Sequence, residues 1–271
     1  MRQLVSTKWL EENIEKVKIL DASWHLPNST RSAEEEFKLN HIKNSLFFDI
    51  DKYSNQTSSL PHMLPSKTDW EKIISQLGIN NSNHIVVYDN SDVFSACRVW
   101  YTFIYFGHNP NLISVLDGNF NKWVKEKRPV SNEVTKIVKA NYNATEDNSL
   151  VINKKQIDEN IKNKEFQLID ARGKKRFLGL EPEPRIGMKN GHIDGSKNLP
   201  FQLLINEDRT FKKIDELTNI FKEKEISIDK DKVFSCGSGI TACILGLANS
   251  LITDKKPKIY DGSWAEYGLK N

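Results

Sequence analysis

Short apolar runs alternate along this chain with stretches of helical periodicity, and both halves show the same order. Helical patterns occupy equivalent places in the two halves, at residues 7–16 and 153–163 and at residues 96–106 and 241–251. Strand-like apolar runs are matched in the same way, at residues 19–22 and 168–171 and at residues 85–88 and 232–235. Short buried strands that alternate with helices predict an α/β domain whose mainly parallel sheet is flanked by helices.

Short motifs also recur in the two halves, in the same order and at a nearly constant separation. The matched pairs are Asp21-Ala22 with Asp170-Ala171, His41-Ile42 with His192-Ile193, Ala96-Cys97 with Ala242-Cys243, and Asp117-Gly118 with Asp261-Gly262. A repeat of this length indicates two copies of one domain. We therefore predict an N-terminal copy at residues 1–130, a polar and charged linker at 131–149, and a C-terminal copy at 150–271.

Composition and charge narrow the function classes. Lys and Arg total 39 against 36 Asp and Glu, a net charge of +3, which does not indicate a nucleic-acid binder. No apolar run approaches the ~18 residues of a membrane span, and the N-terminal stretch is too polar for a signal peptide. The three cysteines form no CxxC pair, so neither a zinc site nor a disulfide framework is expected. We expect a cytoplasmic protein that contacts no membrane.

The duplication separates architectural residues from functional ones. Cys97 is matched by Cys243, and His41 is matched by His192, so we expect structural roles for all four. Cys236 has no matching cysteine, because the equivalent residue in the first copy is Asp89. Cys236 is therefore the candidate for chemistry.

The residues after Cys236 form a small, flexible loop between a strand and a helix, Gly237-Ser238-Gly239-Ile240-Thr241. Glycines allow the backbone N–H groups to turn toward the sulfur, and the following helix N-terminus adds positive partial charge. Both effects stabilise a thiolate, the nucleophilic form of cysteine. We expect Cys236 to be a nucleophile and the loop residues Gly237, Gly239, Ile240 and Thr241 to bind substrate.

Three chemistries use a cysteine in such a loop. A tyrosine phosphatase needs an arginine at the sixth position after the cysteine, and that position is Ala242, which disfavours this reading. A cysteine protease needs a histidine held against the sulfur, which a sequence cannot reveal. A sulfurtransferase needs a loop that stabilises a thiolate and then a persulfide, and the Cys236 loop suits this task best.

These features together resemble the two-domain rhodaneses. The similar motifs are Asp170-Ala171-Arg172, His192-Ile193-Asp194-Gly195 and the Cys236 loop, and the resemblance runs from about Val5 to Gly268. It implies two rhodanese modules, the first inactive and the second carrying the catalytic cysteine, with no metal or organic cofactor. Asp89 at the cysteine position of the first copy fits this pattern.

The resemblance also implies a donor class. Thiosulfate-using members tend to carry basic residues directly after the cysteine, whereas the neutral Gly-Ser-Gly here is similar to 3-mercaptopyruvate sulfurtransferases. It further implies that Arg176, which precedes a Glu-Pro-Glu-Pro-Arg run, and Arg185, which ends it, bind the substrate carboxylate and keto oxygen. Arg172 follows the strand-end Asp-Ala directly, and we expect it to be structural.

A stretch present in the first copy alone, residues 49–65, contains Asp51 and His62. In the resembling family a similar segment reaches toward the cysteine, which implies a proton relay of Asp51, His62 and Ser238. Two tryptophans near these motifs, Trp24 and Trp264, are expected in core or interface positions.

The sequence thus predicts transfer of sulfur from 3-mercaptopyruvate, through a Cys236 persulfide, to a thiol or cyanide, with release of pyruvate. The acceptor is expected to be a thiol, for example that of a thioredoxin-like protein. The alternative is a thiosulfate sulfurtransferase of the same fold. A more distant alternative is a non-catalytic sulfur-carrier or docking module.

Overall fold

The computed structural model describes residues 3–270, which form two compact units. The first unit contains the chain up to Gln56, Leu64–Asp147 and Glu207–Thr210. The second contains Thr57–Met63, Asn148–Asn206 and the chain from Phe211 onward. The short segment Thr57–Met63 therefore groups with the second unit, although it lies in the first half of the sequence.

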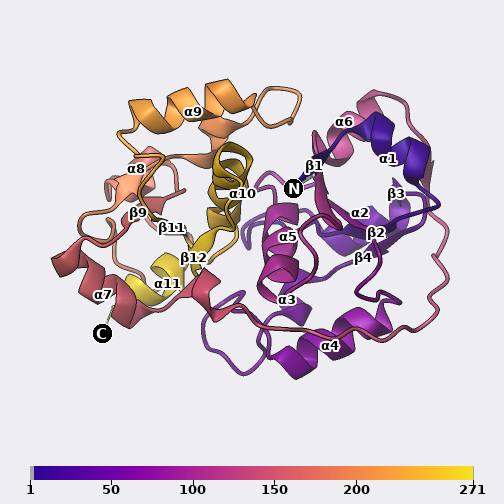
Figure 1. The fold of residues 1–271 in the computed structure, drawn as a ribbon, viewed down its shortest axis with the longest axis horizontal. Coiled ribbons are helices and arrows are strands. Elements are labelled where there is room, and N and C mark those ends of the chain that lie inside the picture. The colour runs from indigo at the N-terminus through magenta and orange to yellow at the C-terminus, as the bar shows by residue number, and fades with distance from the viewer. Residues whose placement is uncertain (1–2, 271) are drawn as a thin grey trace. The chain divides into compact units, whose positions relative to one another are not determined.

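Each unit is built on a five-stranded sheet in which every pair of neighbours is parallel (Figure 1). The first sheet has the order β1 (Leu4–Val5), β6 (Ile113–Leu116), β5 (Ile85–Tyr88), β2 (Lys18–Asp21) and β4 (Ser45–Phe47). The second has the order β10 (Lys197–Asn198), β9 (Gln167–Asp170), β11 (Lys232–Ser235), β12 (Lys258–Tyr260) and β8 (Val151–Ile152). Read in opposite directions the two orders match, so the predicted duplicated α/β fold is confirmed.

The repeat extends to strand register. In the first sheet Asp21 of β2 lies beside Tyr88 of β5, and in the second Asp170 of β9 lies beside Ser235 of β11. The residue that directly follows β5 is Asp89, and the residue that directly follows β11 is Cys236. Both lie at the carboxyl edge of a parallel sheet, where α/β proteins bind their ligands.

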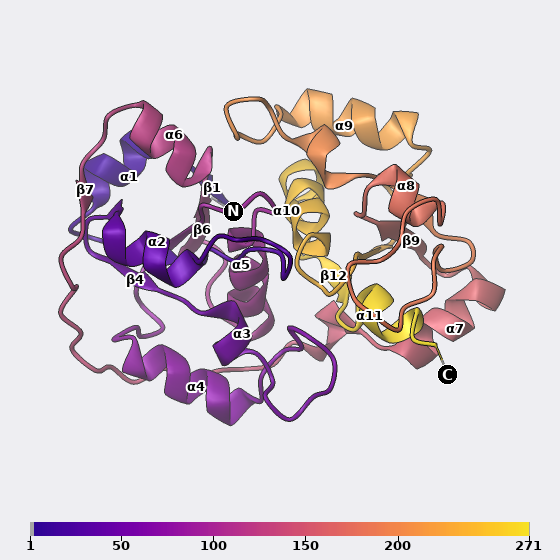
Figure 2. The same cartoon turned by 180° about the vertical axis from the view of Figure 1, so that it is seen from behind.

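Helices cover both faces of the first sheet. On one face α1 (Thr7–Asn13) and α6 (Asn119–Lys125) lie side by side (Figure 2). Their residues Leu10 and Trp123 belong to one buried apolar cluster with Val86 of β5. On the other face are α4 (Lys67–Gln76) and α5 (Ala96–Tyr105), where the Trp70 ring stacks on Phe106 at 5.0 Å. The remaining helices are α2 (Ala33–Leu39) and α3 (Ile50–Tyr53).

The second unit repeats this layering with α7 (Lys154–Asn163) and α11 (Ser263–Tyr267) on one face and α9 (Ile214–Glu223) beside α10 (Ala242–Thr253) on the other. A short helix, α8 (Lys174–Phe177), and the 3-10 turns η1 (Asn148–Leu150) and η2 (Phe201–Leu204) complete it. α7 begins with a capping box between Asn153 and Gln156, which satisfies two backbone N–H groups of its first turn.

Two of the four expected helices differ from the sequence prediction by more than one residue at an end. The helix expected over 7–16 ends at Asn13, whose side-chain amide donates to the carbonyl of Trp9, and Lys16 N–H then turns the chain by bonding to Asn13 O. The helix expected over 241–251 begins one residue later and continues to Thr253, with Thr241 as its N-cap.

Residues expected in the linker lie against the first unit. β7 (Val130–Ser131) pairs antiparallel with β3 (His41–Ile42), and farther along Ala140 N–H donates to Ser75 O at 3.1 Å. Tyr142 is buried. The chain remains grouped with the first unit up to Asp147, where η1 begins the second.

The matched histidines make the same local contacts in both units, although His41 is buried and His192 is exposed. His41 Nδ1 lies 2.7 Å from Phe37 O, and its ring stacks on Phe37 at 4.1 Å. His192 Nδ1 lies 2.8 Å from Phe177 O, and its ring stacks on Phe177 at 3.9 Å. Each imidazole therefore ties the short helix before it to the following turn, which is the architectural role predicted from the repeat.

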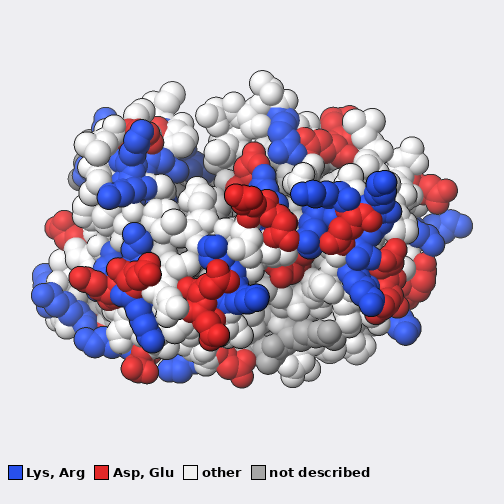
Figure 3. Space-filling model, turned by 90° about the horizontal axis from the view of Figure 1, so that it is seen from above, with Lys and Arg blue, Asp and Glu red and all other residues white. Residues whose placement is uncertain are grey.

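The surface shows no large field of one sign in the view of Figure 3, where acidic and basic side chains are interspersed. Within residues 3–270 no helix combines the length and the apolar character needed to cross a membrane.

Candidate functional site

Cys236 follows β11 directly and is 2% exposed. Its N–H donates to Ser263 Oγ at 3.1 Å, and its carbonyl accepts from Trp264 N–H at 3.0 Å. The next carbonyl, of Gly237, accepts from Ala265 N–H at 2.8 Å. The first turn of α11, which follows the repeated Asp-Gly motif, therefore holds the start of the Cys236 loop in place.

The far side of the loop is held from α10. Gly239 has a φ of +79°, in the left-handed region that a residue with a side chain rarely adopts. Its carbonyl accepts from the Cys243 thiol at 3.2 Å. Cys243 is buried and acts on the loop backbone, in agreement with the structural role predicted for it.

The first unit shows what such a loop does to a side chain at the cysteine position. The Asp89 carboxylate accepts from Ser91 N–H at 2.9 Å through Oδ1 and from Ala96 N–H at 2.9 Å through Oδ2. Ser91 and Ala96 correspond in the repeat to Ser238 and Ala242 of the second unit. Backbone N–H groups of this loop type therefore converge on the residue after the strand, and in the first unit they bind the two oxygens of the Asp89 carboxyl group.

Asp89 makes the stability of the first unit dependent on pH. Burial raises its pKa from 3.8 to about 7, although the two backbone hydrogen bonds oppose this. Between pH 4 and 7 the folded state therefore binds a proton that the unfolded state has lost, so stability falls as pH rises through this range. Relative to Asp89→Asn, the wild type is expected to lose about 2–3 kcal/mol of unfolding free energy between pH 5 and 7.

Urea unfolding of both proteins at pH 5 and pH 7 measures this difference. The comparison cancels most of the titration of Asp21, whose pKa is raised by burial to about 6, because Asp21 is present in both proteins. Identical pH dependence in wild type and variant would show that Asp89 is ionised in the folded state throughout.

Arg176, in α8, lies directly beside the cysteine loop. A methyl group at Gly237 would come within 3.3 Å of its Nη2 atom, so the glycine leaves room for the guanidinium. Arg176 Nη2 donates to Glu183 Oε2 at 2.5 Å, and Nε donates to Glu183 Oε1 at 3.3 Å. The guanidinium is a quarter exposed, whereas the Glu183 carboxylate is buried.

Glu183 is a site residue that the sequence reasoning did not single out. Its Oε1 also accepts from Arg172 Nη1 at 2.7 Å, and Arg172 in turn forms a bidentate pair with Asp170. The Arg172 guanidinium lies 4.6 Å from the centre of the Trp264 ring. A row of alternating acidic and basic side chains therefore connects the end of β9 to the cysteine loop, in the order Asp170, Arg172, Glu183 and Arg176. Arg172 and Trp264 have the structural positions predicted for them.

Ser238, His62 and Arg185 come together on the loop. His62 Nδ1 lies 2.9 Å from Ser238 Oγ, and Arg185 Nη2 donates to the same oxygen at 3.4 Å. His62 belongs to the segment Thr57–Met63 that groups with the second unit, and it is buried with a φ of 60°. The structure thus unites three of the predicted residues around one hydroxyl.

Asp51 belongs to the first unit, at the start of α3. Its Oδ2 accepts from Trp24 Nε1 at 2.9 Å, and Trp24 is buried. Trp24 therefore fixes the orientation of the Asp51 carboxylate. The participation of Asp51 in a relay with His62 stays a prediction.

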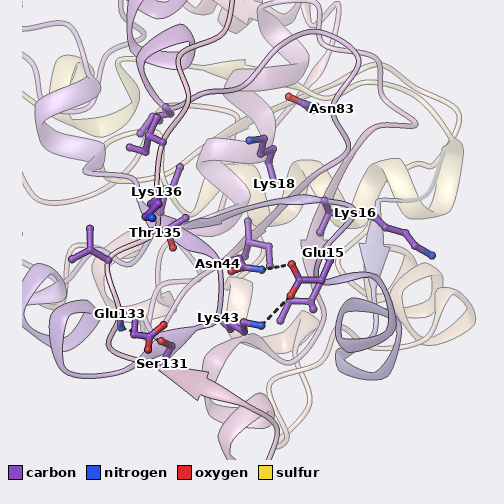
Figure 4. Close-up of a pocket in the computed structure, with 17 residues that line it drawn as sticks. Glu15, Lys16, Lys18, Lys43, Asn44, Asn83, Ser131, Glu133, Thr135 and Lys136 are labelled. Carbon is purple, nitrogen blue, oxygen red and sulfur yellow. Dashed lines mark hydrogen bonds and ion pairs between the residues drawn. The ribbon is translucent and has the colours of Figure 1, made fainter.

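The first unit also contains a cavity of about 630 Å³ at the opposite edge of its sheet, where β2 begins (Figure 4). Lys18, Ser131 and residues 133–137 contribute to its lining, and Lys43 and Asn44 both donate to Glu15 at its rim. None of the predicted site residues lines it. A smaller cavity, of about 300 Å³, includes Trp24 and Asp51 in its lining.

Comparison with known proteins places this geometry in a family. The model of the rhodanese-like domain matches the chain twice, at residues 6–126 and 153–270. The chain belongs to the rhodanese family. Each match covers four of the five strands of one sheet, since β1 and β8 lie just before the matched residues, and the second match contains Cys236 with its loop.

Relatives of both donor types are similar over nearly the whole chain. A thiosulfate sulfurtransferase of Cricetulus griseus is 42% identical over 98% of this chain and 92% of its own. A 3-mercaptopyruvate sulfurtransferase of Mus musculus is 39% identical over 99% of this chain and 93% of its own. Among solved structures, SseA of Escherichia coli, described as a 3-mercaptopyruvate sulfotransferase, has a TM-score of 0.88 at 32% identity, and the match covers 98% of this chain and 100% of SseA. The rhodanese described here is therefore a sulfurtransferase.

Proposed function

We propose that this rhodanese transfers sulfur from 3-mercaptopyruvate to a thiol through a persulfide on Cys236. The observation that carries the proposal is the charge distribution around the loop. The loop residues Gly237, Ser238 and Gly239 carry no charge. The positive charges beside the loop come from residues outside it, with Arg176 next to Gly237 and Arg185 hydrogen-bonded to Ser238. A monoanionic keto acid can place its sulfur at Cys236 and its carboxylate at the arginines. Thiosulfate, a dianion, carries negative charge on the group next to its transferable sulfur.

The first half-reaction is a displacement at sulfur. The Cys236 thiolate attacks the sulfur of 3-mercaptopyruvate, a sulfur–sulfur bond forms and the carbon–sulfur bond breaks. The electron pair of that bond stays on carbon, so pyruvate leaves as its enolate and takes up a proton. Arg176 and Arg185 hold the carboxylate and the keto oxygen, and they stabilise the charge that develops on the enolate oxygen.

Proton movement in this step is assigned to Ser238 and His62. Their 2.9 Å separation is within hydrogen-bond reach, as a relay requires. We propose Asp51 as the carboxylate behind the imidazole. In the second half-reaction the acceptor thiolate, or cyanide, attacks the outer sulfur and Cys236 leaves as the thiolate. A thioredoxin-like protein is our proposed thiol acceptor, and the cytoplasm our proposed location.

Steady-state kinetics with both donors on one preparation test the proposal. We expect kcat/KM for 3-mercaptopyruvate to exceed that for thiosulfate by about 100-fold, since two well-placed carboxylate and keto contacts contribute a few kcal/mol. Cyanide serves as the acceptor in both assays, so the difference reports the donor alone. A higher value with thiosulfate would assign the chain to the other donor class.

A further inference from the structure

The row of ion pairs that ends at Arg176 influences which sulfur donor the site prefers. Asp170 and Glu183 contribute two negative charges, and Arg172 and Arg176 contribute two positive ones. The side chains of Arg172 and Glu183 are 1% and 5% exposed, so solvent screens the ion pair between them weakly. Although Arg176 faces the cysteine loop, its charge is largely balanced by the carboxylate behind it.

We propose that Glu183 is a specificity-determining residue, which limits the positive charge at the Cys236 loop and thereby favours monoanionic sulfur donors over dianionic ones. The inference rests on the proposed function, because it assumes that Arg176 meets the donor. Glu183 reaches Arg176 along the Nε and Nη2 edge and so also sets the direction of the guanidinium. It is a positioning residue that acts through Arg176 and does not itself contact the donor.

The physical reason is the difference of one elementary charge between the donors. Thiosulfate is a dianion and 3-mercaptopyruvate is a monoanion, so a more positive site attracts thiosulfate more strongly. Removal of the Glu183 charge adds one net positive charge close to the loop. In a partly screened site, one added positive charge near the donor favours the dianion by about tenfold relative to the monoanion.

Glu183→Gln tests this, with Glu181→Gln as the matched control. Glu181 lies two positions away in the same loop, is half exposed, and pairs with Lys175 at 3.3 Å. In Glu183→Gln the ratio of kcat/KM for 3-mercaptopyruvate to that for thiosulfate should fall about tenfold, and in Glu181→Gln it should not change. Glu183→Asp keeps the charge and should keep most of the ratio. An equal loss with both donors in Glu183→Gln would indicate a purely structural role and overturn the proposal.

Binding measurements separate this inference from the proposed function. Calorimetry with pyruvate, a monoanion, and sulfate, a dianion, reports charge selectivity without turnover. If 3-mercaptopyruvate is not a donor but Glu183→Gln still shifts affinity from pyruvate toward sulfate, the proposed function fails and the role of Glu183 stands. If Glu183→Gln does not fold, wild-type binding decides. Tighter binding of pyruvate than of sulfate supports the inference, and the reverse order overturns it.

Discussion

A Cys236→Ser variant is expected to lose sulfur transfer by at least about 10³-fold with either donor, since a serine hydroxyl is neither a comparable nucleophile nor able to carry sulfur as a persulfide. The exchange of sulfur for oxygen is small, and the backbone contacts of Cys236 with Ser263 and Trp264 do not involve the side chain of residue 236. The variant should therefore fold as the wild type does. Initial rates with cyanide as the acceptor measure the loss.

Cys97→Ala is the matched control, because Cys97 is the equally buried cysteine of the first unit. It should retain activity, with at most a modest loss of stability from the missing sulfur atom. If Cys236→Ser kept a substantial fraction of the wild-type rate, the transferred sulfur would have to be carried elsewhere, and the assignment of the nucleophile would fail.

Replacement of Arg172 by Met is expected to lower the free energy of unfolding by about 3–5 kcal/mol. The substitution leaves two buried carboxylates, Asp170 and Glu183, without the cation that separates them, and the loss of one partner of a buried ion pair costs about this much. It also removes the guanidinium from the Trp264 ring. Urea unfolding at pH 7 measures the effect.

Lys175→Met is the control for this prediction, since Lys175 lies near Arg172 in sequence and pairs with Glu181 on the surface, where the lysine is 74% exposed. Its loss should cost less than about 1 kcal/mol. A small effect of Arg172→Met, similar to that of Lys175→Met, would mean that water reaches the two carboxylates and that the chain of ion pairs does not stabilise the second unit.

The duplicated fold could be predicted because each copy constrains the other. Both sheets need the same local packing, so the residues that provide it recur in the sequence. These are the matched pairs Asp21 and Asp170, Cys97 and Cys243, and His41 and His192. Helix ends were less accurate because they depend on single side-chain contacts. The end of α1 at Asn13 is set by an amide that bonds back to Trp9, which hydrophobic periodicity does not record.

The candidate site could be predicted in part. The repeat singles out Cys236 because it leaves this cysteine unmatched. The structure brings His62 and Arg185 to Ser238, and the roles that the family resemblance implies for these residues stay predictions. Glu183 was missed, although it lies within the Glu-Pro-Glu-Pro-Arg run that drew attention to Arg185. From sequence alone, a carboxylate in a charged loop is expected on the surface. Only the folded structure shows that Glu183 lies between two arginines. Two arginines around one acidic residue in a Pro-rich loop are the signal that could have identified it.

The central claim, that Cys236 carries the transferred sulfur, is tested most directly by intact-protein mass spectrometry. The wild-type protein is exposed to 3-mercaptopyruvate without an acceptor, freed of small molecules and weighed. We predict a gain of one sulfur atom that disappears on addition of cyanide or a thiol and that is absent from Cys236→Ser. A wild-type protein that gains no sulfur, or a Cys236→Ser variant that gains it equally, would contradict the account.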